Sequence, residues 1–212
     1  ARYLSLAETL AGHPGTYLSL DCSHLGLDAD VRACGLRVQQ IAKRLPRGAR
    51  LQLGAERSAR TDAILSVALA AAAEGAPVML TVQANLRRST RDIEDLARAG
   101  VPIRLVKGAY VEPSGIAHAW GAETDAAYVE LATRLATLEA DHSLATHDQA
   151  ILECLLPPLE RVAGATVECL LGVRPDDARR LAAAGWNVRI YVPYGERWFR
   201  YAARRAAESI GA

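Results

Sequence analysis

The sequence lacks three features that would assign its class at once. It has no excess of charge: 25 Lys and Arg face 24 Asp and Glu, a formal net charge of +1. This balance argues against an extended nucleic-acid-binding face or a membrane-surface protein. No apolar run approaches the roughly 20 residues that cross a bilayer, and the N-terminal stretch ARYLSLAETLAGHPG has no basic start followed by an apolar core. We therefore expect no membrane segment, no signal peptide and no nucleic-acid partner.

Motifs for metals and nucleotides are also absent. The four cysteines form no CxxC pair, and the histidines have no ligand spacing. We therefore expect no metal, and reduced thiols as in a cytoplasmic protein. No GxGxxG follows the first apolar run and no GxxxxGK[ST] occurs, so neither a Rossmann-type site nor a P-loop is supported.

The sequence does contain a regular alternation of apolar runs and helical segments. Seven runs predict strands, at 16–22, 49–55, 77–84, 102–110, 143–148, 165–171 and 187–194. Segments with helical spacing lie between them, at 29–44, 61–74, 90–99, 122–140, 149–161 and 176–184. Gly75, Gly100 and Gly185 follow three of these helices, as C-terminal glycines do. The alternation predicts an α/β protein with a parallel sheet, and no linker interrupts a single domain over residues 1–212.

Polar residues at the strand ends favour a barrel over an open sheet. They recur at the ends of most runs, as Asp21, Glu56, Gln83, Asn85, Lys107, Thr146, Glu168 and Tyr191. Barrel enzymes build their sites at these carboxyl ends. A closed barrel needs eight strands, so either the first 15 residues contain one more or the barrel is incomplete. An incomplete barrel leaves a sheet edge that a partner subunit or the N-terminal residues could cover, and the first of these alternatives favours a homodimer.

Two strand ends carry groups with several chemical interpretations. In RLVKGAY (104–110), Arg104 and Lys107 need an anionic or electron-rich partner. An ion pair with a neighbouring Glu and a Schiff-base lysine both remain open for Lys107. In ATHD (145–148), the Thr146, His147 and Asp148 side chains could bind a metal, form a catalytic base pair or hydrogen-bond a cofactor.

A further helix is expected after the turn at Pro193 and Gly195, and it concentrates arginine. Arg197, Arg200, Arg204 and Arg205 follow a strand that ends at Tyr191. They form either a solvated helix face or an anion site. Neighbouring residues on a helix are about 100° apart, so Arg204 and Arg205 can hold one carboxylate if the edge between them faces it.

Taken in order, these motifs resemble the proline dehydrogenase family from about residue 16 to 209. The resemblance is carried by RLVKGAY (104–110), ATHD (145–148), LLGVRP (170–175), YVPYG (191–195) and the RR pair at 204–205, with VQA (82–84) and DAAY (125–128) in support. It implies a distorted (β/α)8, TIM-barrel-like fold with non-covalently bound FAD. It also implies oxidation of L-proline to Δ1-pyrroline-5-carboxylate, with a quinone as electron acceptor and a place at the membrane periphery.

For the substrate pocket, the resemblance implies roles for the matched residues. Arg204 and Arg205 would clamp the substrate carboxylate, and Glu208 would support the two arginines. Tyr191 would pack on the proline ring, and Leu170 would line the same pocket. The implied chemistry is hydride transfer from the carbon next to the amine, for which the protein supplies orientation and electrostatics.

For the FAD site, the resemblance implies a second set. Gln83 would bond the edge of the flavin ring, and Arg104 would lie near its reactive nitrogen and favour the anionic reduced form. The remaining implied contacts run along the cofactor or touch its adenosine half, and they are Val106, Lys107, Gly108, Ala109, Thr146 and His147.

The sequence departs from the family pattern at several of these places. Asp21 stands where the family has a substrate-binding Lys, and Gly54 stands where it has a supporting Asp. Glu168 replaces a flavin-contacting Gln, Gly121 replaces a Lys near the FAD pyrophosphate, and the first barrel strand, DxLGE, is not found. An anion in place of a cation beside a carboxylate weakens binding by about 1–3 kcal/mol.

Three functional hypotheses follow. The first is a flavin-dependent dehydrogenase or oxidase of proline or a related cyclic amino acid. The second is a catalytically lapsed homologue that binds a ligand or partner, favoured by Asp21, Gly54 and Glu168. The third is a cofactor-free lyase that uses Lys107 as a Schiff base.

Overall fold

The structure is a computed structural model, and it describes all residues except 1, 12, 14, 160–164 and 196–212. The chain divides into two compact units, unit 1 (Ala1–Asp141) and unit 2 (His142–Ala212). Each has its own strands and helices. The prediction of a single domain over residues 1–212 stays a prediction.

Unit 1 is a parallel sheet whose strands follow chain order. Its strands are β1 (Tyr17–Leu20), β2 (Arg50–Leu53), β3 (Val78–Gln83) and β4 (Ile103–Val106). Each of them pairs in parallel with the next. The helices of this unit are α1 (Arg2–Thr9), α2 (Val31–Ala42), α3 (Thr61–Ala73), α4 (Ser89–Arg98) and α5 (Ala122–Thr137). Two short 3₁₀ turns, η1 (Cys22–Leu25) and η2 (Ser58–Arg60), follow β1 and β2.

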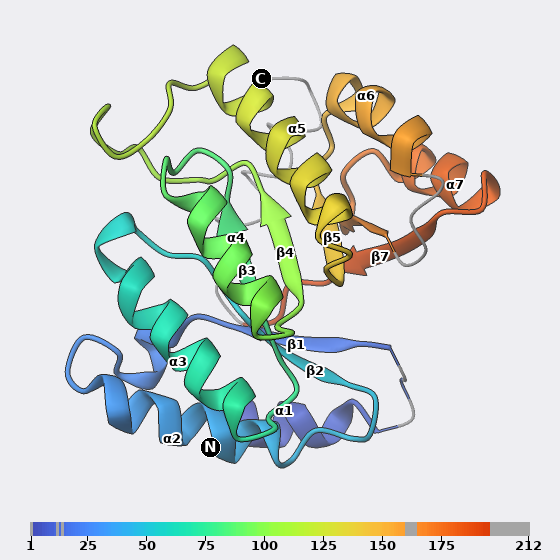
Figure 1. Cartoon of the computed structure of the whole chain (residues 1–212). Coiled ribbons are helices and arrows are strands. Elements are labelled where there is room, and N and C mark those ends of the chain that lie inside the picture. Colours follow the sequence, from blue (N-terminus) through green and yellow to red (C-terminus); the bar gives the residue numbers. More distant parts are fainter. Residues whose placement is uncertain (1, 12, 14, 160–164, 196–212) are drawn as a thin grey trace. The chain divides into compact units, whose positions relative to one another are not determined.

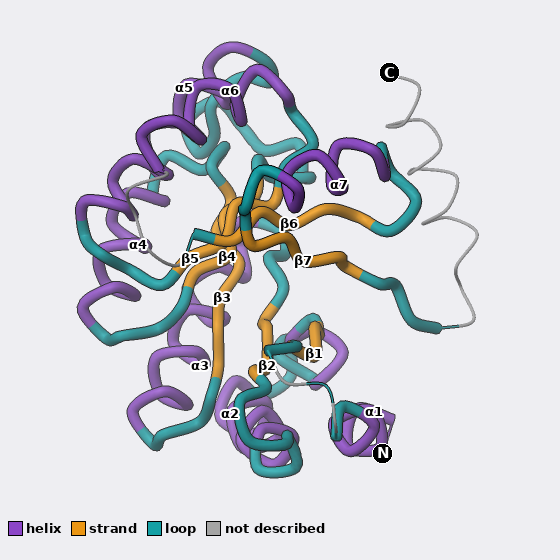
Figure 2. The backbone as a smooth tube through the Cα atoms, turned by 90° about the vertical axis from the view of Figure 1, so that its right-hand side faces the viewer, coloured by secondary structure: helices purple, strands orange, loops and turns teal. Residues whose placement is uncertain are grey.

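The two faces of this sheet differ in chemistry because side chains alternate along a strand. Leu51, Leu53 and Leu105 are fully buried, and α2, α3 and α4 pack against the strands as Figures 1 and 2 show. On the other face, the Ser19 hydroxyl donates to Gln52, whose amide donates to Thr81. We call this second face of β1–β4 the polar face.

The helix ends of unit 1 follow the sequence signals. Asp30 caps α2 by accepting the Ala33 N–H at 3.0 Å. Gly75 and Gly100 follow α3 and α4 with φ of +79° and +68°, which confirms the predicted glycine stops. The first residues form α1, which contacts α2. The described residues before Thr16 contain no strand, so the interpretation that this segment holds one is wrong.

Unit 2 continues the strand–helix alternation. Its elements are β5 (His142–Ala145), α6 (Gln149–Leu159), β6 (Thr166–Leu170), α7 (Pro175–Ala183) and β7 (Asn187–Tyr191). β6 pairs in parallel with both β5 and β7. Leu152, Val167, Cys169 and Ala178 form one buried cluster of this unit, with Trp186 packed against them. The described part of the chain thus contains all seven predicted strands.

Candidate active site

Several candidate site residues lie on the polar face near the carboxyl ends of β1–β4. Thr81 pairs in register with Arg104, and Gln83 pairs with Val106. Register partners in a parallel sheet point to the same side, so Arg104 and Val106 share the polar face with Thr81 and Gln83. The structure therefore places Gln83 and Arg104 on the same face of neighbouring strands, and the flavin contacts that the family resemblance implies for them stay predictions.

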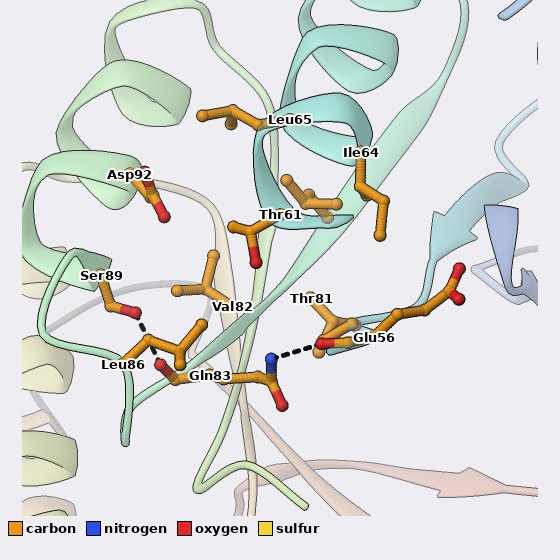
Figure 3. A pocket seen from close by; sticks show the side chains of 12 residues that line it. Glu56, Thr61, Ile64, Leu65, Thr81, Val82, Gln83, Leu86, Ser89 and Asp92 are labelled. Atoms are coloured by element: carbon orange, nitrogen blue, oxygen red, sulfur yellow. Dashed lines mark hydrogen bonds between the residues drawn. The ribbon is translucent and has the colours of Figure 1, made fainter. Parts of the chain in front are cut away.

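Gln83 is held by the loop that follows β2. Its side-chain Nε2 donates to the backbone carbonyl of Glu56 at 2.9 Å, and its backbone carbonyl accepts the Ser89 hydroxyl at 2.6 Å (Figure 3). The side chain is buried. An amide carries two N–H donors and an oxygen acceptor, so the bond to Glu56 leaves the second donor and Oε1 for another partner.

Behind β3 lies a small cavity between α3 and α4. Thr61, Ile64, Val82, Leu86 and Ser89 are among the residues that line it (Figure 3). Its volume of about 20 Å³ holds a water molecule but neither a flavin nor an amino acid. The cavity is therefore no candidate for the substrate or cofactor site.

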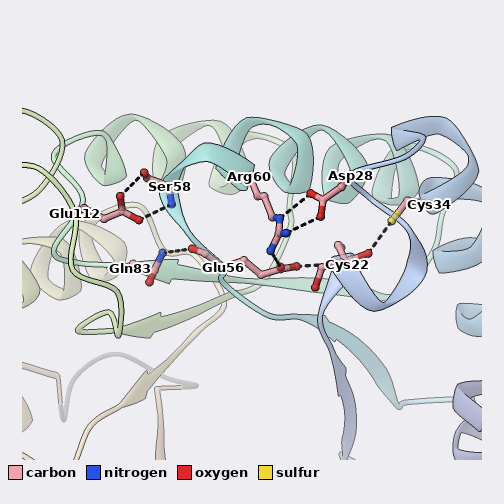
Figure 4. A network of polar contacts seen from close by, with 9 residues as sticks. Cys22, Asp28, Cys34, Glu56, Ser58, Arg60, Gln83 and Glu112 are labelled. Atoms are coloured by element: carbon pink, nitrogen blue, oxygen red, sulfur yellow. Dashed lines mark hydrogen bonds and ion pairs between the residues drawn. The ribbon is translucent and has the colours of Figure 1, made fainter.

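Glu56 is a buried carboxylate at the end of β2, with 5% of its side chain exposed. One oxygen accepts the Ser23 N–H at 2.8 Å, and the other is 2.7 Å from the Arg60 guanidinium. Arg60 also binds Asp28 through two nitrogens (Figure 4). A buried carboxylate requires such compensation, so this network fixes the loops after β1 and β2.

Asp21 lies next to this network at the end of β1. Burial raises the pKa of the Asp21 carboxyl, and the neighbouring Glu56 charge raises it further, while His24 lowers it. A Cβ on Gly54 would fall far inside van der Waals contact of Asp21 Oδ1. Gly54 therefore makes the space that the Asp21 carboxylate occupies.

The segment after β4 carries the predicted flavin contacts. Lys107 Nζ is 2.5 Å from Asp125 Oδ1, in the first turn of α5. Gly108 has φ of +117°, and a Cβ there would lie 2.6 Å from Asn85 Cγ. Arg104, Val106, Lys107 and Gly108 are half-buried and Ala109 is exposed. The Lys107 ammonium is thus engaged in an ion pair with Asp125, which argues against a nucleophilic Schiff-base lysine.

In unit 2, His147 bridges the ends of β5 and β6. Its Nε2 accepts the Leu170 N–H at 2.9 Å, which places the ring proton of the neutral imidazole on Nδ1. Thr146 is buried and its hydroxyl accepts the Asp148 N–H at 3.1 Å. Asp148 in turn accepts the Ile151 N–H at the start of α6. Asp148 thereby caps the start of α6.

A buried ion pair joins β6 to β7. Arg189 Nη1 is 2.8 Å from Glu168 Oε1, and only 1% of the Glu168 side chain is exposed. The two residues are register partners, as are Leu170 and Tyr191 further along. The four side chains thus share one face of unit 2, which brings predicted pocket residues Leu170 and Tyr191 together with Glu168. The predicted residues Arg204, Arg205 and Glu208 lie outside the described residues.

Two features are absent from the described ranges. No helix there is both long and apolar enough to cross a bilayer. No group of three or more His, Cys, Asp or Glu side chains there could hold a metal ion.

Sequence reasoning missed the partners of two charged site residues. Asp125 was noted for the DAAY motif and not as the counter-ion of Lys107. Arg189 was not singled out, although its position two residues before Tyr191 places both side chains on the same face of β7. Asn85 was seen only as a polar strand end, and nothing in the sequence indicates that it packs under Gly108.

Parallel strands alternating with helices define an α/β protein of the barrel-like class, and polar side chains gather at the carboxyl ends of its strands. The sequence model described as proline dehydrogenase matches residues 2–211. The chain therefore belongs to the proline dehydrogenase family.

Curated relatives agree with this membership. The chain is 33% identical over 203 residues to the proline dehydrogenase of Deinococcus radiodurans, covering 91% of this chain and 66% of that protein. It is 36% identical over 132 residues to proline dehydrogenase 1 of Bacillus subtilis, covering 60% of this chain and 43% of that one. The chain thus spans less than two thirds of the length of either relative.

Solved structures share the fold. Proline utilization A (PutA) of Bradyrhizobium japonicum matches 99% of this chain with a TM-score of 0.86 at 22% identity, over 26% of its own length. PutA of Bdellovibrio bacteriovorus, inactivated by N-propargylglycine, matches 98% of this chain with a TM-score of 0.85 at 21% identity, over 27% of its length. The likeness confirms the predicted barrel-like α/β class.

Proposed function

We propose that the protein oxidises L-proline or a related cyclic amino acid to the corresponding pyrroline-type imine, with FAD as hydride acceptor. The observation that carries this proposal is the family match over residues 2–211. A polar sheet edge with Gln83, Arg104 and Lys107 supports it, because those residue types at strand ends are what a bound anionic cofactor needs.

The described residues of unit 1 fit a flavin dinucleotide. Asn85 Oδ1 is a buried acceptor without a hydrogen-bond partner in the described part of the chain, which a polar ligand or water would satisfy. Gln83 has a second amide donor, and Arg104 and Lys107 supply positive charge beside it. When bound, FAD supplies the redox centre for the oxidation.

In this proposal the chain's own groups bind and orient. Gln83 would donate to the ring edge of the flavin and Arg104 would stabilise negative charge on it. The family resemblance gives Val106, Lys107, Gly108 and Ala109 contacts along the cofactor, and it gives Thr146, His147 and Glu168 cofactor contacts as well. Tyr191 and Leu170 would enclose the substrate ring, and Arg204, Arg205 and Glu208 would hold its carboxylate.

The test is flavin retention and inactivation. Protein incubated with FAD and freed of excess by gel filtration should retain a band at about 450 nm, since the redox chemistry belongs to the cofactor. N-propargylglycine, with which the Bdellovibrio protein was inactivated, should block turnover of proline. Protein that retains no flavin would contradict the proposal.

A second candidate is a catalytically lapsed homologue that binds a ligand or partner. Asp21 beside Gly54 favours it, because a carboxylate replaces the family's cation there. Flavin that is retained but never reduced by any amino acid would establish this alternative. We also propose a homodimer and a quinone or similar electron acceptor, and mass measurement in solution tests the former.

A further inference from the structure

Asp21 occupies a defined place on the polar face. Its backbone is extended, with φ of −100° and ψ of 133°, so the alternation of β1 continues from Ser19 to Asp21. The Gly54 N–H donates to the Leu20 carbonyl at 2.8 Å, so the β1–β2 ladder also reaches this level. Gly54 adds no side chain, and the Asp21 carboxylate lies where its Cβ would be.

The surroundings of this carboxylate are acidic. Glu56 lies close enough to disfavour its charge, and the weaker influence of His24 opposes that effect. Arg60 is the nearest guanidinium of this network, and it is already bound to Glu56 and Asp28. In the portion of the chain that the structure describes, the Asp21 side chain makes no hydrogen bond or ion pair.

A half-buried carboxylate with these neighbours gains from a cation. Among the ligands of an amino-acid dehydrogenase, the cationic group is the protonated amine next to the oxidised carbon. An ammonium N–H donating to a carboxylate is a charge-assisted hydrogen bond, stronger than a neutral one. A substrate carboxylate at the same place would meet two negative side chains.

We propose that Asp21 accepts the protonated amine of the substrate and so selects ligands by their ammonium group. Asp21 is then a specificity-determining residue, and Gly54 is the residue that gives it room. This inference rests on the proposed oxidation of an amino acid.

The first test compares ligands that differ in one charge. Calorimetric affinities are measured for proline, for pyrrolidine, which has only the amine, and for cyclopentanecarboxylate, which has only the carboxylate. Asp21→Asn should weaken proline and pyrrolidine roughly ten- to hundredfold and leave cyclopentanecarboxylate unchanged. Asp141→Asn is the matched control, because Asp141 is exposed and binds Arg50 at the start of β2, and it should alter no affinity.

The second test measures the thermal stability of Asp21→Asn. If the Asp21 carboxylate stabilised the fold, this substitution would lower the Tm instead of raising it. Folding raises the pKa of the Asp21 carboxyl. The free energy of unfolding therefore falls as the pH rises from the unfolded pKa through the folded pKa, because the charged carboxylate is disfavoured in the folded protein. Asp21→Asn should therefore raise the Tm at pH 7, and the gain should shrink as the pH falls toward about 4. Asp21→Asn that lowers the Tm at pH 7 would overturn the assignment.

The experiments give different outcomes if the role of Asp21 is wrong and if the proposed oxidation is wrong. Equal loss for all three ligands, or no loss, overturns the role of Asp21 even when proline still reduces the flavin. Wild-type protein that prefers no amine ligand also overturns it. Absence of flavin reduction by any amino acid, with the ligand preference intact, contradicts only the proposed oxidation.

Discussion

Replacing Gly108 by Ala perturbs the segment after β4 in two separable ways. The φ of +117° is one that L side chains rarely adopt, and such backbone strain costs about 1–3 kcal/mol. The new Cβ would also lie 2.6 Å from Cγ and 3.0 Å from Nδ2 of Asn85. Asn85 is 4% exposed and cannot swing into solvent, so overpacking adds about 1–3 kcal/mol. Gly108→Ala should destabilise the protein by about 2–6 kcal/mol in total.

Urea unfolding of four variants separates the two costs. Gly100→Ala is the matched control, because Gly100 has φ of +68° and no atom within 4 Å of its would-be Cβ; it should cost only about 1–2 kcal/mol. Asn85→Ala removes the clash, so the double variant Asn85→Ala/Gly108→Ala should be more stable than the sum of the single costs predicts. Two results together would refute the close approach of Asn85 and Gly108. They are a Gly108→Ala cost no larger than that of Gly100→Ala, and a double variant whose loss of unfolding free energy equals the sum of the two single losses.

Two ion pairs give further predictions. Arg60→Met should destabilise by about 2–3 kcal/mol, because among the described residues it leaves the buried Glu56 carboxylate with the Ser23 N–H alone. Arg44→Met breaks an exposed pair with Glu8 and should cost under about 1 kcal/mol. Equal costs by urea unfolding would contradict the burial argument. Arg189→Met should cost about 3–5 kcal/mol because it removes the guanidinium that lies 2.8 Å from the buried Glu168 carboxylate, and adding Glu168→Gln should recover part of that loss. A double variant as unstable as Arg189→Met by thermal unfolding would count against a charge effect.

The strands and most helices could be predicted because periodicity and glycine stops are local signals. β4 is instructive: the apolar pattern predicts a strand over 102–110, yet it ends at Val106. The φ of Gly108, which lets it approach Asn85, turns the chain away. α1 escaped prediction because eight residues of mixed character make a marginal helix alone, and its contact with α2 supplies the rest.

The candidate site could be predicted as residue types at strand ends but not as pairings. An ion pair with a Glu was one of two alternatives open for Lys107, and its partner is instead Asp125, in the first turn of the helix that follows a long loop. Cross-strand register decides that Glu168 faces Arg189, and spacing along one strand does not reveal it. The sequence shows only that Gly54 stands where the family has an Asp. The pairing of β1 with β2 is needed to show that the Asp21 carboxylate lies in the space that a side chain at position 54 would take.

Anaerobic titration of the FAD-loaded protein tests the central claim most directly. Absorbance at about 450 nm is followed while proline, hydroxyproline or pipecolate is added, since reduction of the flavin removes that band. The account predicts stoichiometric bleaching by at least one of these cyclic amino acids. A flavin band that none of them bleaches, in protein that dithionite reduces normally, would contradict it.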